Sequence, residues 1–245
     1  MCTDDLMVYF YLYCYGDKNT FATSLYLIDC LKMIIDYDQL RREYRHATLN
    51  KNEMHMDPIV AFDTWFQQAI DLELQLPNAM TLATVNGEGK PAARSVLLKS
   101  FDKSGFVFFT HSVSSKGQQI AKTPYAALVF YWSPIHRQVR IEGTVERVSE
   151  KEADEYFASR PYGSRIAVWV ADQSSIIESR EFMEEKVREL EQQYPEDVPR
   201  PETWVGYRVK PESLEFWQGR ENRLHDRIFY EKDENGDWRK HRLAP

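Results

Sequence analysis

The chain has 245 residues, which is enough for one domain with a sizeable core and does not require two. Hydrophobic residues make up 43% and charged residues 28%, which excludes disorder as the main state. The 31 Lys and Arg against 38 Asp and Glu give a formal net charge of −7. This charge argues against a general nucleic-acid-binding protein, because such a protein needs a basic surface to neutralise phosphates.

The cysteines and histidines narrow the chemistry further. Cys2, Cys14 and Cys30 all lie in the first 30 residues, so the main body has no disulfide framework, zinc–thiolate site or cysteine nucleophile. We expect these cysteines to be reduced thiols in a cytoplasmic protein. The six histidines do not pair at metal-ligand spacings on one element, so no metal is expected.

The first 35 residues differ in character from the rest. The apolar run Leu6–Tyr15 has ten residues, whereas a membrane span needs about 20. Asp4 and Asp5 stand where a secretory signal carries positive charge. We therefore expect neither a membrane anchor nor a signal, but an extension without a core of its own or an over-long start, with Met33 as the first residue. Residues 36–245 are expected to form a single domain.

Local signals predict one helix followed by a series of strands. Asp57 and Pro58 form a helix start, and apolar residues at helical spacing continue until the helix ends near Pro77. Turn residues at 86–89 and 102–105 separate three strand-like runs, which predict two hairpins in series. These runs are Met80–Val85, Ala92–Phe101 and Phe106–Thr110.

The rest of the chain is also typical of strands. The apolar run Tyr125–Trp132 predicts a strand buried on both faces, and the alternation in Gln138–Val148 predicts a half-exposed strand. Ser149 is expected to cap a short helix, and Asn235-Gly236 to join the last two strands. The expected helices are Glu152–Ser159 and Ser175–Gln193, and the expected strands are Trp204–Val209, Leu214–Trp217, Leu224–Glu231 and Trp238–Leu243. The fold class is mainly β (α+β), an antiparallel barrel with flanking helices.

Two clusters of positive charge are candidates for an anion site. If Arg223, His225 and Arg227 enter a strand, alternation places all three on one face, where a bound anion would offset their repulsion. A solvated strand face is the alternative. Arg94 and Lys99 would face opposite sides of a regular strand, so one compact ligand could not contact both. Charges that only flank the strand and aid solubility are the alternative for this pair.

Two further clusters combine hydroxyl groups with a cation. The run Ser-Ser-Lys-Gly at 114–117 opens a short helix, and a helix N-terminus with a Lys typically binds phosphate. A plain N-cap is the alternative. Tyr156 and Arg160 share a helix face and Ser164 follows the turn, which suits a second phosphate. The alternative is an Arg that interacts favourably with the helix dipole.

Several separated motifs agree in order with one family. The chain resembles the pyridoxine/pyridoxamine 5′-phosphate oxidases over about residues 40–245, on RSVLLK (94–99), YFASRPYGS (156–164), RLHDR (223–227) and RLAP (242–245). The resemblance implies a split β-barrel homodimer with FMN at the subunit interface and a dimerisation region at about 200–245. It also implies oxidation of pyridoxamine or pyridoxine 5′-phosphate to pyridoxal 5′-phosphate, with O₂ as acceptor and release of H₂O₂.

The resemblance further implies roles for individual residues. Arg223 and His225 would be catalytic, lying over the pyridine ring at the reacting carbon. The implied substrate-binding residues are Arg41, Tyr44, Lys99, Tyr156, Arg160, Ser164, Arg223 and His225, with Arg41 and Tyr44 on an N-terminal lid. The implied FMN-binding residues are Arg94, Ser95, Val96, Leu97, Leu98, Lys99, Phe109, Thr110, Ser115, Lys116, Gln138, Gln173, Ser174, Trp217 and Arg227.

Two positions depart from the family pattern. Ser115 stands where the family usually has Arg, so we expect FMN binding weaker by about 1–2 kcal/mol than in relatives with Arg, unless another cation substitutes. Ser115→Arg should then bind FMN more tightly than wild type in a fluorescence titration, and equal affinities would contradict this expectation. Phe109 stands where Tyr is common, so a stacking contact survives but a hydroxyl contact does not.

Two other functions stay open at the level of sequence. A split-barrel flavoprotein that reduces another substrate, or only binds flavin, would share the fold, but the phosphate set Tyr156, Arg160 and Ser164 weighs against it. A β-barrel that binds nucleic acid or a protein partner through aromatic and Arg side chains is the second, and the negative net charge disfavours it.

Overall fold

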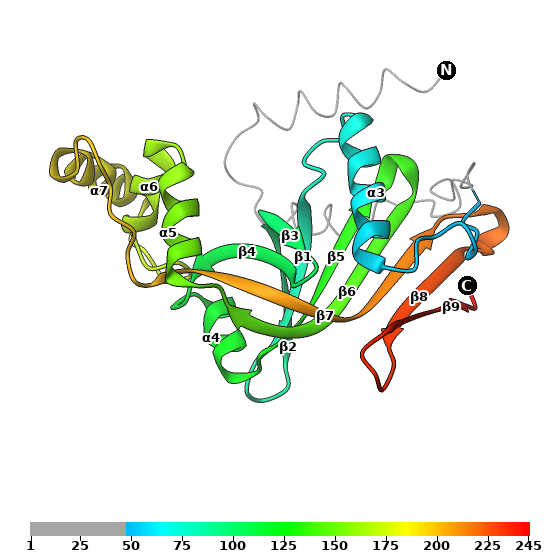
Figure 1. Cartoon of the computed structure of the whole chain (residues 1–245). Coiled ribbons are helices and arrows are strands. Elements are labelled where there is room, and N and C mark those ends of the chain that lie inside the picture. Colours follow the sequence, from blue (N-terminus) through cyan, green and yellow to red (C-terminus); the bar gives the residue numbers. More distant parts are fainter. Residues whose placement is uncertain (1–47) are drawn as a thin grey trace, which may run out of the picture. The chain divides into compact units, whose positions relative to one another are not determined.

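A curled antiparallel sheet of nine strands organises residues 48–245, the part of the chain that this computed structural model describes (Figure 1). Its hydrogen-bonded order is β2-β1-β5-β6-β7-β4-β3, and β8 pairs with β7 and β9. The predicted antiparallel, mainly β fold with flanking helices is thereby confirmed. The strands are β1 Ala79–Val85, β2 Pro91–Leu97, β3 Ser100–Asp102, β4 Gly105–His111, β5 Tyr125–Trp132, β6 Arg137–Arg147, β7 Trp204–Gln218, β8 Asp226–Lys232 and β9 Trp238–Leu243.

The predictions for the N-terminal part lie outside the described residues. They concern the extension 1–35, the start at Met33 and the lid residues Arg41 and Tyr44, and they stay predictions. In the part that is described, no helix is both long and apolar enough to span a membrane. The helices there are α3 Pro58–Asp71, α4 Ser115–Lys122, α5 Glu150–Ser159, α6 Tyr162–Trp169 and α7 Arg180–Gln193, with short 3₁₀ turns at Ser133–Ile135 and Glu221–Arg223.

Helix α3 packs its apolar face against the sheet. Asp57 caps it as predicted, accepting a hydrogen bond from the Ile59 N–H at 2.8 Å. Phe62 is fully buried, and its ring meets the edges or faces of aromatic rings from β3, β4 and β5 at 4.9–5.0 Å. The helix ends at Asp71 and not near Pro77, because Glu73 and Leu76 have φ values of 51° and 48°, which a helix cannot accommodate.

The expected strand 92–101 is broken, and this break splits the barrel. β2 pairs with β1, whereas β3 pairs with β4, so the two hairpins do not form one continuous meander. Leu98 and Lys99 connect them: the Leu98 N–H donates to the Asn78 carbonyl (2.8 Å), and the Lys99 N–H donates to the Val107 carbonyl of β4 (2.9 Å). The two ends of the strand order are therefore joined by this two-residue link and not by a continuous ladder.

Strand β7 is one continuous strand where two were expected. Its first half pairs with β4 and its second half with β8, while β6 lies along the other edge. Pro211, which has no N–H, falls where β4 has ended and β8 has not begun, so it does not interrupt the strand. The register shifts there: Glu142 and Gly143 of β6 pair with Ser213 and Pro211, so Glu212 of β7 is the extra, bulged residue. A Cβ atom at Gly143 would lie 1.9 Å from the Lys210 carbonyl oxygen.

Three further predictions need correction. β5 is buried on one face only, because Tyr125 and Tyr131 are 42% and 51% exposed while the residues between them alternate. α7 begins at Arg180 and not at 175, since Ser179 is the residue that caps it, and α6 was not expected. β8 begins at Asp226, so Arg223 lies in a 3₁₀ turn and the predicted shared strand face of Arg223, His225 and Arg227 is wrong.

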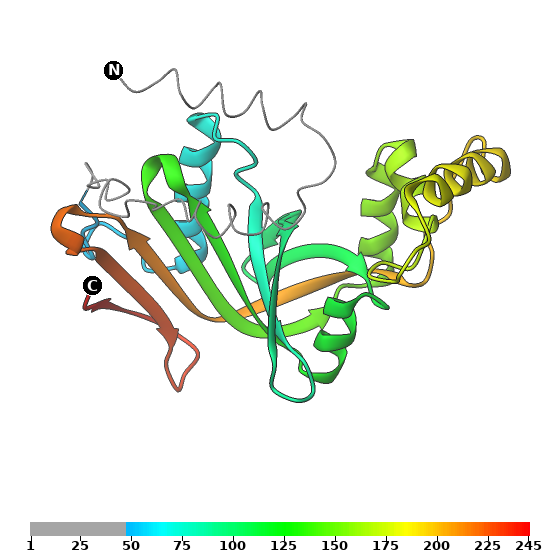
Figure 2. The ribbon, with the colours of Figure 1, turned by 180° about the vertical axis from the view of Figure 1, so that it is seen from behind.

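The ends of β7 lie in two different surroundings. Trp204, at its start, packs in a small second core with α5, α6 and α7. Its last residues pair with β8, which carries β9. Figures 1 and 2 show these helices at one end of the sheet and the β8–β9 hairpin at the other.

Candidate active site

A cavity of about 450 Å³ opens beside the Leu98-Lys99 link. It is lined by Arg94 from β2, Lys99 from the link, Lys116 from the first turn of α4 and Arg160 from the end of α5. We call it the cationic cavity. Arg94 and Lys99 reach the same cavity because the strand breaks between them, so the regular strand that would have separated them is not formed.

Neutral oxygens hold Arg94 in place. Its Nη1 donates to Thr84 Oγ1 (2.5 Å) and to a backbone carbonyl (3.2 Å), and its Nη2 donates to Gln119 Oε1 (3.0 Å). Burial lowers the pKa of the Arg94 guanidinium, but not enough to discharge it. The side chain is therefore fixed while its full charge stays available.

Lys116 is held in the same way at the start of α4. It is 9% exposed, and its Nζ donates to Gln173 Oε1 (2.7 Å) and Thr110 Oγ1 (3.2 Å). Burial, and secondly the charge of Arg94, lower the pKa of Lys116. Ser114 caps the helix, and Gly117 is required because a Cβ there would lie 2.4 Å from the Ser112 carbonyl oxygen.

Arg160 lies against a stack of aromatic rings. Its guanidinium carbon is 5.0 Å from the centre of the Trp204 ring. The rings of Phe109, Tyr156 and Trp204 are nearly parallel and in mutual contact, with centre-to-centre distances of 4.2, 5.0 and 6.0 Å. Lys99 Nζ lies 5.8 Å from the Tyr156 ring centre. Arg160 Nη1 is buried and has no hydrogen-bond partner among residues 48–245, which is unusual for a buried donor and points to a ligand acceptor.

Carboxylates do not neutralise this cluster. Among the described residues, none of the four cations forms an ion pair, whereas Arg200 and Arg208 each contact two carboxylates. Like charges around one cavity repel each other, and a bound anion would reverse that cost. The cavity is thus built to take an anionic ligand beside aromatic rings.

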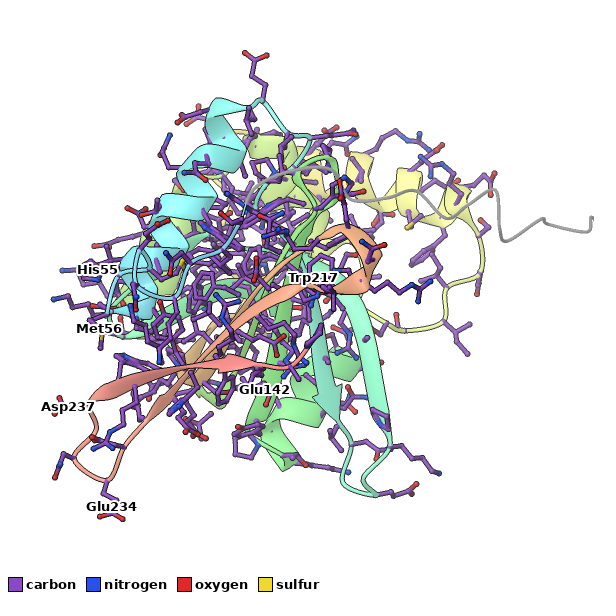
Figure 3. All side chains as sticks on the ribbon, turned by 90° about the vertical axis from the view of Figure 1, so that its right-hand side faces the viewer. His55, Met56, Glu142, Trp217, Glu234 and Asp237 are labelled. Atoms are coloured by element: carbon purple, nitrogen blue, oxygen red, sulfur yellow. The ribbon has the colours of Figure 1, made fainter. Side chains whose placement is uncertain are left out.

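A second group of predicted residues lies elsewhere on the sheet. Gln138, Trp217 and Arg227 face each other across β6, β7 and β8. Together with His225, whose ring contacts Trp217, they form what we call the sheet-end row. The His225 ring lies 4.7 Å from that of Trp217, and its Nδ1 accepts a hydrogen bond from the Arg220 N–H at 3.1 Å. Figure 3 shows Trp217 at this end of the sheet. None of these residues lines the cationic cavity.

The structure brings together most of the other predicted cofactor residues. Ser115 lies at the start of α4, and its N–H donates to Ser174 Oγ at 3.4 Å. Leu98, in the link itself, is buried in the core, and Ser164 lies half-buried on α6; neither lines the cavity. The remaining predicted residues that do line it are Ser95, Val96, Leu97, Phe109, Thr110, Tyr156 and Gln173.

Sequence reasoning missed several residues of the site, among them Ala167 and Val168 of α6, which line the cavity. Trp204 and His111 line the cavity, and Gln119 positions Arg94 from outside it. Gln119 lies one helical turn after Ser115, so helical spacing could have drawn attention to it. His111 and Trp204 pair with each other across β4 and β7, a contact that no local signal reveals.

The half-barrel thus carries, at the split of the sheet, a cavity whose cations and aromatic rings suit an anionic ligand with a planar ring system. Comparison with known families agrees. The model of the family described as pyridoxamine 5′-phosphate oxidase matches residues 66–194, and that of the pyridoxine 5′-phosphate oxidase C-terminal dimerisation region matches residues 204–245. The chain belongs to the pyridoxamine 5′-phosphate oxidase family, and the resemblance seen in its motifs is confirmed.

The matches to individual relatives span nearly the full length of those relatives. The chain is 55% identical over 207 residues to the pyridoxine/pyridoxamine 5′-phosphate oxidase of Gloeothece citriformis, covering 84% of this chain and 97% of that one. It is 51% identical over 208 residues to the enzyme of the same name from Paraburkholderia phytofirmans, covering 84% and 98%.

Solved structures share the fold. PhzG from Burkholderia lata, in complex with tetrahydrophenazine-1-carboxylic acid, superimposes with a TM-score of 0.77 at 31% identity, over 81% of this chain and 98% of that one. A pyridoxamine 5′-phosphate oxidase-related, FMN-binding protein from Nostoc punctiforme has a TM-score of 0.64 at 17% identity, over 78% and 100%. The second likeness concerns the fold alone.

Proposed function

We propose that this chain is an FMN-dependent oxidase that converts pyridoxamine 5′-phosphate and pyridoxine 5′-phosphate to pyridoxal 5′-phosphate. O₂ would be the acceptor, H₂O₂ the second product, and a cytoplasmic homodimer the working form. The observation that carries this proposal is the cationic cavity, where four cations that form no ion pair within residues 48–245 line one cavity together with aromatic rings.

The residues at the start of α4 fit the phosphate of FMN. Arg94 and Lys116 present fixed, charged donors there, next to the N–H groups of a capped helix, which is a common arrangement for binding phosphate. Bound FMN would supply the redox chemistry, accepting a hydride from the substrate carbon and passing the electrons to O₂. The protein supplies binding, orientation and charge.

A second phosphate, that of the substrate, would bind between Lys99, Tyr156 and Arg160. The partnerless Nη1 of Arg160 gives this assignment a donor that has no other use in the described part of the chain. A phosphate held here is remote from the reacting carbon, so its binding energy fixes the approach of the pyridine ring. The stacked Phe109 and Tyr156 keep this wall of the cavity rigid.

The sheet-end row would complete the site from a second copy of the chain. The match to a dimerisation region covers residues 204–245, which include Trp217, Arg223, His225 and Arg227. These residues do not line the cavity of their own chain. Burial, and secondly the charge of Arg223, lower the pKa of His225, so a neutral imidazole would orient the substrate ring and would not act as an obligatory base.

A spectrum followed by a turnover assay tests the proposal. The purified protein should show flavin absorbance and, on addition of pyridoxamine 5′-phosphate, release H₂O₂ and form an aldehyde chromophore. Bound flavin without turnover would favour a flavin-binding protein or reductase with another substrate. A colourless protein that binds no added FMN would contradict the proposal altogether.

A second candidate function comes from the likeness to PhzG. That structure contains a carboxylated tricyclic compound without phosphate. Lys99 and Arg160 could pair with a carboxylate, but its two oxygens match the donors of Lys99, Tyr156 and Arg160 less completely than the three terminal oxygens of a phosphate. Comparison of kcat/KM for pyridoxamine 5′-phosphate and a reduced phenazine carboxylate separates the two, and we expect the phosphorylated amine to be preferred.

A further inference from the structure

His111 is the most deeply buried titratable side chain of the cationic cavity, and nothing above assigns it a role. It is the last residue of β4 and is 7% exposed, yet it lines the cavity together with Lys116 and Arg160. Its backbone carbonyl accepts hydrogen bonds from the N–H (3.1 Å) and the hydroxyl (2.7 Å) of Ser114. These bonds fix the backbone of His111 next to the start of α4.

The second observation concerns the hydrogen bonds of the His111 ring. Nδ1 of His111 is buried without a partner among the described residues, and none of their side chains bonds its other nitrogen. Buried polar groups nearly always have a partner, so an imidazole left in this state at the wall of a cavity indicates a group that meets a ligand.

Charged groups reach His111 from three directions. Lys116 faces it from α4 and Arg160 from the end of α5, and both repel a proton on the ring, while Asp172 from the segment after α6 favours one. Burial is the largest influence, and together with the two cations it holds the pKa of His111 below its ordinary value, against the opposing effect of Asp172. A phosphate dianion among these groups would add negative charge and reverse the balance.

We propose that His111 is a further ligand of a phosphate group bound in the cationic cavity, and that it takes up a proton when that phosphate binds. This deepens the proposed function, because FMN and the substrate each carry such a phosphate. It also gives the cavity a fifth positive charge near the position where Ser115 provides none. The chemistry recognised is a phosphate monoester, and the ligand arms of the test separate the two sources.

Titration of the His111 ring by NMR tests the proposal in the wild-type sequence, without any amino-acid substitution. In protein freed of flavin, the pKa of His111 should lie below its ordinary value of about 6.5. FMN or pyridoxamine 5′-phosphate, whichever places its phosphate there, should raise the pKa above that value. Riboflavin and pyridoxamine, which lack the phosphate, should leave it unchanged. An imidazole that does not respond to either phosphorylated ligand would overturn the proposal.

Substitution provides an independent measurement. His111→Asn, whose spectrum also assigns the signal, should weaken binding of the responding ligand about tenfold near pH 6 and much less near pH 8.5. His241→Asn, on the exposed face of β9, is the matched control and should leave the affinity for that ligand unchanged at both pH values. Equal affinities of wild type and His111→Asn at both pH values would overturn the proposal.

Failure of the proposal for His111 can be distinguished from failure of the proposed function. Wild-type protein that binds neither flavin nor vitamin B6 phosphate would sink the proposed function, and inorganic phosphate would then serve as the probe. A rise in the pKa of His111 on adding inorganic phosphate would still support its role as an anion ligand. An unchanged pKa would overturn it.

Discussion

Positively charged side chains in two regions of this molecule have different partners. In the cationic cavity, the hydrogen bonds that Arg94 and Lys116 donate within residues 48–245 all go to neutral oxygens. At the far end of β7, Arg220 and Arg242 donate to Asp226, and Arg227 donates to both oxygens of a buried glutamate. The first arrangement fixes the cation and keeps its charge for a ligand, whereas the second uses that charge to hold the fold together. The type of partner, more than the number of cations, therefore distinguishes a ligand site from a structural network.

The segment Arg220–Arg227 contains residues of the structural network and also two residues, Arg223 and His225, that we expect to meet the substrate. Substitution of these two should have the largest effect, on kcat. Arg223→Ala and His225→Ala should each lower kcat by about 100-fold or more, because these side chains would meet the reacting ring. FMN content should stay at the wild-type level. Arg239→Ala, on exposed β9, is the control for turnover and for the flavin-to-protein ratio. Loss of flavin from the first two variants would refute this division of roles.

Removal of a cation from the cavity should act on the cofactor instead. Arg94→Ala should weaken FMN binding by about 50-fold, because a charge-assisted contact to phosphate is lost. Binding of riboflavin should change little, and fluorescence titration with both ligands measures the difference. Arg180→Ala, on the exposed side of α7, is the control. Equal weakening for the two ligands would show that Arg94 does not act on the phosphate.

The structural network should respond to acid. Burial raises the pKa of Asp226, but the Leu49 N–H, Arg242 and Arg220 more than offset this, so its pKa lies below the ordinary value. Such a carboxyl stabilises the fold above its unfolded pKa of about 3.9, and this stabilisation is lost as the pH falls through the folded-state pKa.

Asp226→Asn should accordingly lower the free energy of unfolding by about 2 kcal/mol at neutral pH. The difference from wild type should begin to shrink at about pH 4 and vanish only as the pH falls through the lowered folded-state pKa. Urea unfolding at several pH values measures it. Glu234→Gln, at the exposed tip of the β8–β9 turn, is the control. A difference that is constant with pH would rule out the ion pairs as its source.

The smallest predicted effect, on FMN affinity, comes from giving Arg94 a carboxylate partner in place of a neutral amide oxygen. Gln119→Glu places a carboxylate against Arg94, so part of its charge is neutralised and FMN binding should weaken about fivefold. Gln118→Glu adds the same charge at an exposed neighbour whose amide donates to the Val113 carbonyl, and it is the matched control. An equal loss in both variants would mean that only net charge matters.

Sequence reasoning succeeded where the signal is local. Asp57, Ser149 and the Asn235-Gly236 turn were all predicted correctly, because caps and tight turns depend on a few adjacent residues. The C-terminal end of α3 and the start of α7 were wrong because neither Gly nor Pro marks them. The fold class followed from alternation and turns together.

The long-range features could not be read in this way. The break at Leu98-Lys99 contains no Gly or Pro, and it exists because two distant strands, β1 and β4, compete for the same segment. Grouping of Arg94, Lys99, Lys116 and Arg160 therefore came from family resemblance and not from spacing. His111 escaped notice because its burial depends on pairing with Trp204, more than 90 residues away.

The length of β7 has a genetic consequence. From Trp204 to Trp217 the strand runs about 40 Å, so one rigid element separates the cavity from the sheet-end row by more than a small molecule can bridge. If two copies share each site, a chain defective in the cavity and a chain defective in the row can complement each other. A hybrid of Arg94→Ala and His225→Ala subunits would then contain one intact centre and one doubly damaged centre. At an FMN concentration that leaves the Arg94→Ala parent largely without flavin, the hybrid would recover about half of the wild-type rate and exceed both parents.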